Sequence, residues 1–182
     1  MGDPLCGNCA QRLVPPQPRC IKSVDAVVAL CSYEGAGADL VLAIKRRNQR
    51  GVLRSIGAAL RSELDCPPLT ATPAVTWAPT TAQRRRERGF DQAEELARAV
   101  TKSSHWRSRR LLKRASSEQM GLSRAERVER PRFEPIGSVR NEQQTVVLVD
   151  DVVTTGATAS AAAKVLRQAG AKRVLLAVIA VA

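Results

Sequence analysis

The sequence predicts an α/β fold in which helices cover both faces of a mainly parallel β-sheet. Hydrophobic residues make up 44% of the 182 residues but aromatic residues only 3%, so the core must be built from Val, Leu, Ile and Ala. Two apolar stretches, 145–149 and 173–181, flank a helical stretch, 158–169, that Gly170 closes. Neither apolar stretch alternates polar with apolar residues, which is typical of parallel strands buried on both faces.

The elements before this strand–helix–strand unit follow from residue spacing. The segment 1–22 holds three of the five cysteines and four of the ten prolines, so we expect a small, irregular, cysteine-containing segment before a main domain, 23–182. Apolar, β-branched residues predict a strand over 25–33. Helical spacing of apolar residues then predicts helices over 39–46 and 51–64.

The middle of the chain is more basic. A short strand, 74–78, ends at Pro79 and leads into a loop that is dense in arginine. Asp91 is a suitable N-cap for a helix with apolar residues at helical spacing over 93–100. The stretch 103–135 is rich in Arg and poor in apolar residues, so we expect exposed helical pieces and loop there. Its cluster 107–114 is interpreted as solvated surface, with nucleic-acid contact as the alternative.

The charge balance points to polyanionic partners. The chain has 29 Lys and Arg residues against 17 Asp and Glu residues, a formal net charge of +12. Such an excess favours nucleotides, pyrophosphate or nucleic acid as partners, without choosing among them. No apolar run has the length of a membrane span, and the N-terminal residues lack the pattern of a signal peptide, so a cytoplasmic location is expected.

Two adjacent carboxylates, Asp150 and Asp151, follow the strand 145–149, at the end where ligands of parallel sheets bind. The two negative charges would repel each other. Their placement is explained if both carboxylates accept hydrogen bonds from the paired hydroxyls of a ribose. The stretch Thr154–Thr158 then leads into a helix, whose backbone N–H groups and dipole bind phosphate. Gly156 permits close backbone approach. The spacing therefore predicts a site that binds ribose hydroxyls beside a turn that binds phosphate.

The same residues could form an ordinary helix cap, but a cap needs only one such side chain. The stretch lacks both the GxxxxGK[ST] of a P-loop and the GxGxxG of a dinucleotide-binding fold. As a whole, VVLVDDVVTTGAT closely resembles the phosphoribosyl pyrophosphate (PRPP) motif of type I phosphoribosyltransferases. That resemblance implies that Asp150 and Asp151 hold the ribose hydroxyls. It assigns the 5-phosphate to a run of small residues: Thr154, Thr155, Gly156, Ala157 and Thr158.

Further segments narrow the resemblance. RRRERGFDQAEELA, GLSRAER and the PRPP motif together are similar to the ComF family, phosphoribosyltransferase-like proteins linked to DNA uptake. The similarity runs from about Cys6 to the end of the chain and includes the YEG segment at Tyr33 and Lys45 before a basic stretch. It implies a type I phosphoribosyltransferase-like fold. DNA-uptake proteins and nucleic acid become candidate partners.

The loop after the second strand contacts pyrophosphate in type I enzymes. The matching residues here are Ala78, Pro79, Thr80 and Thr81, and this chain has two threonines where ComF proteins often have a histidine or other polar residue. Arg84 and Arg88 lie close enough in sequence to contribute. A solvated loop is the alternative interpretation of the arginine run, but its place beside the predicted site favours an anion-binding role. We therefore expect catalysis to involve Asp150 and Asp151 on the ribose side, with Arg84 and Arg88 stabilising the departing pyrophosphate.

ComF-like proteins commonly carry an N-terminal zinc knuckle built from two CxxC pairs. The resemblance implies zinc at the CxxC pair Cys6 and Cys9, which supplies only two of the four ligands that a structural zinc site needs, so we expect Cys20 as a third. Cys31 could complete the set, although it falls in a predicted strand, or a further pair could lie upstream of Met1.

The resulting hypothesis is a phosphoribosyltransferase that binds PRPP with Mg²⁺ and transfers the phosphoribosyl group to a nitrogen acceptor with release of pyrophosphate. The metal would be held largely by the substrate, because the chain offers no all-protein cage. The alternative is a non-catalytic PRPP-binding accessory protein of DNA uptake or nucleic-acid metabolism. No pattern in 103–135 identifies the acceptor.

Overall fold

Five parallel strands form the central sheet of the computed structural model, in the order β1-β7-β6-β2-β3. They are β1 (Ala26–Ser32), β2 (Ala74–Trp77), β3 (Arg107–Ser108), β6 (Thr145–Val153) and β7 (Arg173–Val181). The structure describes residues 10–47, 50–65, 69, 71–102, 104–115, 132–139 and 144–182. The predicted α/β class with a mainly parallel sheet is confirmed.

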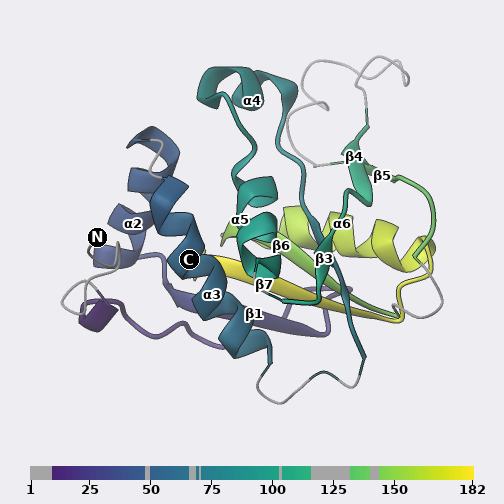
Figure 1. Ribbon diagram of the computed structural model, residues 1–182, viewed down its shortest axis with the longest axis horizontal. Helices are drawn as coiled ribbons and strands as arrows, with labels where there is room; N and C mark the ends of the chain where they lie inside the picture. Colours follow the sequence, from purple (N-terminus) through teal and green to yellow (C-terminus); the bar gives the residue numbers. More distant parts are fainter. Residues whose placement is uncertain are drawn as a thin grey trace.

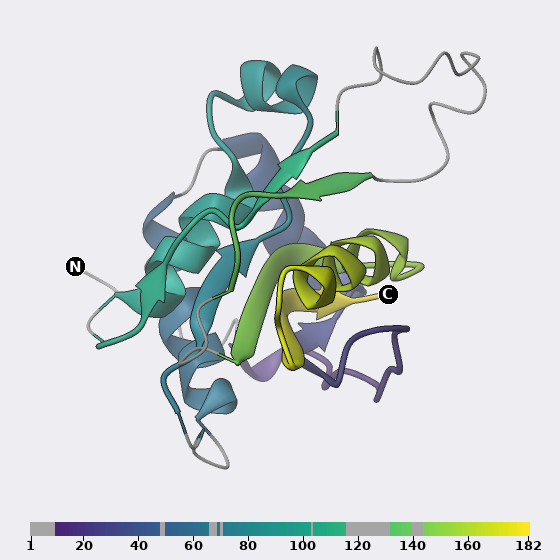
Figure 2. The ribbon, with the colours of Figure 1, turned by 90° about the vertical axis from the view of Figure 1, so that its right-hand side faces the viewer.

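Helices cover both faces of this sheet, as predicted (Figures 1 and 2). One face carries α2 (Gly35–Arg47), α3 (Arg50–Leu64) and α5 (Gln92–Thr101). The other face carries α6 (Ala157–Gln168) and the antiparallel hairpin of β4 (Leu112–Arg114) and β5 (Phe133–Pro135). A further short helix, α4 (Ala82–Arg88), lies above the sheet in Figure 1 and contributes no buried residue.

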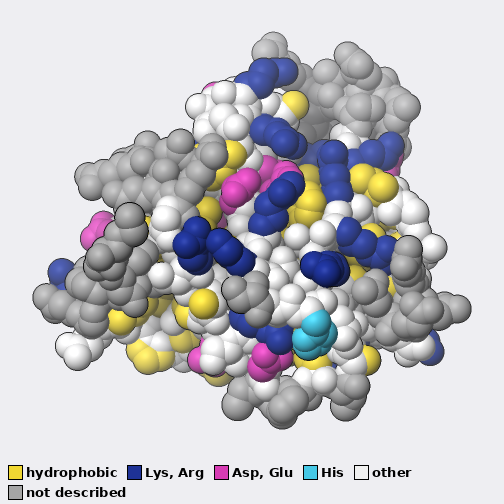
Figure 3. Space-filling model, viewed as in Figure 1, with side chains coloured by type: hydrophobic (Ala, Val, Ile, Leu, Met, Phe, Trp, Pro, Cys, Tyr) yellow, Lys and Arg dark blue, Asp and Glu magenta, His cyan; other side chains and the backbone are white. Residues whose placement is uncertain are grey.

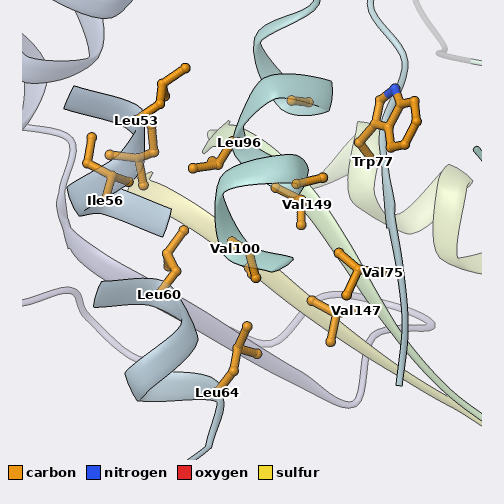
Figure 4. Close-up of a cluster of buried hydrophobic side chains, with 14 of the residues drawn as sticks. Leu53, Ile56, Leu60, Leu64, Val75, Trp77, Leu96, Val100, Val147 and Val149 are labelled. Carbon is orange, nitrogen blue, oxygen red and sulfur yellow. The ribbon is translucent and has the colours of Figure 1, made fainter. Parts of the chain in front are cut away.

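Alternate side chains of the central strand β6 pack into two separate hydrophobic cores, one on each face of the sheet. Val147 and Val149 pack into the cluster under α3 and α5, where Leu96 and Leu60 meet them (Figure 4). Val146 and Leu148 pack into the opposite cluster, against α6. All four β6 side chains are fully buried. A strand that is buried on both faces has no polar side to show, which is why its sequence does not alternate.

The N-terminal segment is irregular, and it contacts both cores. Leu13 packs against the cluster beneath α3 and α5, and Ile21 packs against the α6 cluster. The Ser32 backbone N–H donates to the Val14 carbonyl at 2.8 Å, so the segment runs beside the end of β1. Among the described residues, no helix has both the length and the apolarity needed to cross a membrane.

The structure corrects the prediction of an arginine-dense loop, because the run containing Arg84 and Arg88 is the helix α4. Thr81 caps its start, since its hydroxyl accepts the Arg84 N–H at 3.2 Å, and Gly89 ends it in the left-handed conformation with φ +76°. Arginine is a good helix former, and solvent screens its charge on an exposed helix. Charge density alone was therefore the wrong guide to structure.

The prediction of exposed helical pieces within 103–135 is also wrong for the described residues. Residues 104–115 and 132–135 contain the short strands β3, β4 and β5 and no helix, because the few apolar side chains there are buried. Trp106, Leu112 and Phe133 are at most 7% exposed and pack into the two cores. Residue spacing gives such isolated apolar residues too little weight.

Two predicted boundaries also move. The helix expected over 39–46 begins four residues earlier, at Gly35. Strand β6 continues through Asp150 and Asp151 to Val153, so the carboxylates lie within the strand and near its carboxyl end. Asp150 is in register with Val178 of β7, which extends the parallel pairing into the site.

Helices α3 and α5 approach so closely that the contact requires a glycine. A Cβ atom at Gly57 would lie 2.5 Å from the carbonyl carbon of Ala99 and 2.6 Å from its Cβ. We expect Gly57→Ala to lower the free energy of unfolding by about 1–3 kcal/mol, because the two helices must separate. Gly51→Ala in the same helix is the matched control: its Cβ meets nothing within 4 Å, so we expect a gain of about 0.5–1 kcal/mol. Chemical denaturation measures both, and equal effects would contradict this packing.

Candidate functional site

The site lies where the order of strand connections reverses, between the neighbouring strands β2 and β6. Trp77 of β2 is in register with Val149 of β6, and the Ala78 N–H donates to the Val149 carbonyl at 3.0 Å. After β2 the chain turns toward β3, whereas after β6 it turns toward β7, on the opposite side. The two loops therefore diverge and leave a crevice at the carboxyl ends of the strands, where ligands of open parallel sheets bind.

A cavity of about 350 Å³ occupies this position. On the face of the molecule that Figure 3 shows, Lys and Arg side chains gather around Asp and Glu side chains near the middle, below α4. The lining residues come from separate parts of the chain: Tyr33, Lys45, Ala78, Pro79, Thr80, Arg84, Arg88, Asp91, Gln92, Ala93, Arg114, Asp150, Asp151, Val152, Thr154 and Thr158. Most of the residues that the sequence singled out for the site are among them.

The two predicted carboxylates line the cavity together. Asp151 forms an ion pair with Lys45 of α2, with 2.8 Å between Nζ and Oδ2, and both side chains are less than a quarter exposed. The Asp151 N–H donates to Asp150 Oδ1 at 2.8 Å, and the Val152 N–H donates to Asp151 Oδ1 at 2.7 Å. The positive charge that compensates the pair thus comes from α2, a helix that is distant in the sequence.

The charge of Asp150 is only partly compensated. Burial, followed by the charge of Asp151, raises the pKa of Asp150 well above its ordinary value. The Asp151 backbone N–H and the Lys45 charge act in the opposite direction and are weaker. Since burying a carboxylate is costly unless it is paired, the site holds an acceptor that a hydrogen-bond donor would stabilise.

The threonine-rich turn after β6 is divided between the cavity and the protein. Thr154 and Thr158 line the cavity, whereas Thr155, Gly156 and Ala157 do not. The Thr155 hydroxyl accepts the Ala157 N–H at 3.3 Å, as a cap would. Gly156 has φ +77°, a conformation that side chains disfavour.

Gly156 is also packed against the N-terminal segment. A Cβ atom there would lie 3.2 Å from the Ile21 side chain. The N-terminal segment therefore packs against the start of α6, a contact that the motif did not predict. Thr154 and Thr158, on either side of this helix start, line the cavity, and phosphate binding there stays a prediction.

A single peptide unit in the loop after β2 is held from both sides. The Pro79 carbonyl accepts a hydrogen bond from Arg114 Nε at 3.0 Å, and the Thr80 N–H donates to Asp91 Oδ2 at 2.9 Å. Asp91 is also the N-cap of α5, as predicted, through its Oδ1 atom. Ala78, Pro79 and Thr80 line the cavity, but Thr81 is used to cap α4.

Three guanidinium groups reach the cavity from two elements. Arg84 and Arg88 lie one turn apart on α4, and Arg114 ends β4. In the part of the chain that the structure describes, none of the three forms an ion pair with a carboxylate. Cations gathered in this way around one cavity make it a favourable place for a polyanion.

Gln92, at the start of α5, contributes a buried amide. It is only 6% exposed, and its Oε1 accepts a hydrogen bond from Arg88 at 2.7 Å. Its Nε2 is buried and has no acceptor among the described residues. An unsatisfied buried donor costs free energy, and such groups are often kept for function.

The sequence did not assign Lys45, Gln92 or Arg114 to the site. Lys45 and Gln92 lay within segments that carried the family resemblance, but neither had a local partner to suggest a role. Arg114 belonged to the cluster 107–114 that was interpreted as solvated surface, and this interpretation is corrected for Arg114, which is half-buried in the cavity. Alternation along β4 was the available signal, because Leu112 is buried and Lys113 is exposed.

The cysteines contribute no metal site in the described residues. Cys6 and Cys9 lie outside those residues, so their predicted zinc binding remains a prediction. Cys20 is a free, exposed thiol. Cys31 is buried in β1, where its thiol donates to the Ile179 carbonyl at 3.4 Å and burial raises the pKa of the thiol. That environment suits a core residue better than a metal ligand.

One comparison with known proteins, that with a family model, agrees with the motif. The family model described as phosphoribosyl transferase domain matches residues 89–181, just over half of the chain. No curated protein matches the chain. Among solved structures, the chain is similar to a purine phosphoribosyltransferase from Pyrococcus horikoshii, with 18% identity and a TM-score of 0.41, covering 71% of this chain and 72% of that one.

The raised pKa of Asp150 predicts a pH-dependent stability. The folded protein holds the Asp150 proton more tightly than the unfolded chain does, so the wild type loses stability as the pH rises from 3.8, its ordinary pKa, toward the raised value. Asp150→Asn removes this loss and retains an oxygen for the Asp151 N–H. We expect the variant to unfold at higher denaturant than the wild type at pH 7, and the difference to shrink toward pH 4.

Asp39→Asn, at an exposed position of α2, is the control for this experiment. Its difference from the wild type should stay small across the same pH range. If Asp150→Asn were less stable than the wild type at every pH, the carboxylate would be stabilising the fold, and the charge of Asp150 would not be the burden that its raised pKa implies.

Proposed function

This chain belongs to the phosphoribosyl transferase domain family, and we propose that it binds PRPP in the cavity between β2 and β6 and transfers the phosphoribosyl group to a nitrogen acceptor. One observation carries the proposal. A single cavity joins a carboxylate pair, the start of a helix and three guanidinium groups that form no ion pair with a carboxylate of the described residues. PRPP presents the matching set: two ribose hydroxyls, a 5-phosphate and a pyrophosphate.

The ribose would lie over the end of β6. Its 2- and 3-hydroxyls would donate to Asp150 and Asp151, whose oxygens are strong acceptors in a half-buried setting. The 5-phosphate would bind at the N-terminus of α6, with the hydroxyls of Thr154 and Thr158 as further donors. Thr155 and Gly156 would contribute through the backbone N–H groups of the same turn, and Ala157 would join them if its N–H exchanged the Thr155 hydroxyl for the phosphate.

The pyrophosphate would lie toward β2 and α4. The loop formed by Ala78, Pro79 and Thr80 begins directly beside Asp150, because Trp77 is in register with Val149. Arg84 and Arg88 face the same cavity from α4. This order along the sheet edge, phosphate then ribose then pyrophosphate, matches the order of groups in PRPP.

The reaction would break the bond between C1 of the ribose and the pyrophosphate oxygen, while the acceptor nitrogen forms a new bond to C1. Negative charge develops on the departing pyrophosphate, and fixed cations at that position lower the barrier. Arg84 and Arg88 are suited to this role because they form no ion pair with a carboxylate of the described residues. Asp150 and Asp151 would hold the ribose so that C1 faces the acceptor.

Mg²⁺ fits this site as a partner of the substrate. Carboxylate and phosphate oxygens are the ligands it prefers, and Asp150 and Asp151 offer the former. Across the described residues no group of three or more His, Cys, Asp or Glu side chains could hold a metal. The ion would therefore arrive with PRPP and supply charge neutralisation for the pyrophosphate.

Within the family we assign the chain to the ComF-like proteins. The support is the segment RRRERGFDQAEELA, whose residues build α4, the Asp91 cap and the start of α5. In the structure this segment supplies Arg84, Arg88 and Gln92 to the cavity. Its sequence is thus tied to the proposed pyrophosphate side of the site, and the net charge of +12 suits the polyanionic partners that the assignment implies.

A second function, PRPP binding without turnover, has one observation in its favour. The Thr80 N–H, a natural donor to pyrophosphate, is already bonded to Asp91. Asp91 is 4% exposed, and a carboxylate at that position disfavours a nearby anion. A protein that binds PRPP as a signal needs the pocket but not a loop ready for charge transfer.

Calorimetry with PRPP and Mg²⁺ tests the binding. We expect the double variant Asp150→Asn with Asp151→Asn to lose affinity by about 100-fold or more, because two charge-assisted hydrogen bonds become neutral ones. The matched control is Asp39→Asn with Glu63→Gln, which removes two exposed negative charges from α2 and α3. Its affinity should stay within about threefold of the wild type.

Turnover is then measured as pyrophosphate release with a panel of nucleobases and amines. Release that depends on an acceptor and is abolished in the double variant supports the transferase. Tight PRPP binding with no release on any acceptor leaves the non-catalytic function, and absence of PRPP binding by the wild type contradicts both.

A further inference from the structure

Arg114 is the guanidinium that no motif assigned, and its setting differs from that of the arginines on α4. It comes from the last residue of β4, on the hairpin that packs beside α6. Along this strand the side chains alternate, so Lys113 is exposed and pairs with Glu134 at 2.9 Å, whereas Arg114 is half-buried and lines the cavity.

Two contacts hold the Arg114 side chain. Its Nε donates to the Pro79 carbonyl at 3.0 Å, and its guanidinium carbon lies 5.3 Å from the centre of the Phe133 ring. A guanidinium fixed through Nε and against an aromatic ring has lost most of its rotational freedom. The remaining nitrogens are then pre-oriented donors that a bidentate oxyanion can use.

The charge on Arg114 is poorly compensated in the free protein. Burial, followed by the charge of Arg84, lowers the pKa of Arg114, and the charges of Asp150 and Asp91 offset this only in part. It forms no ion pair with a carboxylate of the described residues. A half-buried cation next to another cation is unfavourable unless an anion joins them.

We infer that Arg114 binds the pyrophosphate of PRPP and anchors it to the loop Ala78–Pro79–Thr80. The inference rests on the function proposed above and assigns that site a residue outside its motifs. Arg114 and Arg84 grip the same anion from β4 and α4. Because Arg114 also holds the Pro79 carbonyl, it ties the bound pyrophosphate to the loop after β2.

The buried amide of Gln92 is an independent observation for the same region. Its Oε1 is taken by Arg88, and its Nε2 has no acceptor among the described residues. An oxyanion between the arginines gives this donor an acceptor after a small side-chain rotation. Gln92 and Arg114 reach the cavity from different elements, so their agreement does not depend on one local geometry.

The test separates the two ends of the substrate. Binding of PRPP, of pyrophosphate and of ribose 5-phosphate, each with Mg²⁺, is measured for the wild type, Arg114→Gln and Arg114→Lys. We expect Arg114→Gln to weaken PRPP and pyrophosphate binding by about 10- to 100-fold and ribose 5-phosphate binding by less than about threefold. Arg114→Lys keeps the charge but lacks the planar fork, so its loss should be intermediate. Lys113→Gln, one residue away, is the matched control and should leave all three affinities within about threefold.

The outcomes are distinguishable. If the wild type binds neither PRPP nor ribose 5-phosphate, the proposed function fails and this inference with it. If the wild type binds both and Arg114→Gln keeps its affinity for PRPP, only the inference is overturned. Equal weakening of all three ligands would assign Arg114 a structural role and would also overturn it. If Arg114→Gln does not fold, Arg114→Lys decides the matter by the same comparison.

Discussion

Repulsion between two neighbouring carboxylates is the constraint around which this site is organised. Asp150 and Asp151 lie near the carboxyl end of the central strand, where burial raises the pKa of Asp150. Lys45 pairs with one of them from α2, and backbone N–H groups of β6 support both. Compensation is incomplete, since the pKa of Asp150 stays high. A fold keeps such a cost where a ligand removes it, and paired hydroxyls are suited to do so.

The same imbalance is visible across the cavity, with the opposite sign. Arg84, Arg88 and Arg114 converge without carboxylate partners in the described residues, so the cavity is acidic beneath the proposed ribose and basic beside the proposed pyrophosphate. The polarity follows from topology, because β6 supplies Asp150 and Asp151 while β4 and α4 supply the three arginines. The peptide unit between Pro79 and Thr80 links these halves through Arg114 and Asp91.

How far the sequence predicted this structure depends on whether a feature is local. The strands β1, β6 and β7 and the helix α6 were recognisable as apolar runs and helical spacing, and Asp91 was recognisable as a cap. Helix α4 was missed because charge was taken as evidence of a loop, although Thr81 and Gly89 marked its ends.

The residues of the site divide in the same way, into those that the sequence predicted and those that it did not. Asp150 and the threonine turn form one continuous motif, whereas Lys45 and Arg114 join it only through the packing of α2 and the β4–β5 hairpin. No local pattern records a contact made across the sheet.

The central claim is that Asp150 and Asp151 read the paired hydroxyls of a ribose that carries a 5-phosphate. Calorimetric competition between ribose 5-phosphate and 2-deoxyribose 5-phosphate tests this most directly, because the two ligands share the phosphate and differ by one hydroxyl. We predict that ribose 5-phosphate binds about tenfold or more tightly, since the deoxy sugar leaves one buried acceptor without its donor. Equal affinities would show that the phosphate alone directs binding, and would contradict the role assigned to the carboxylate pair.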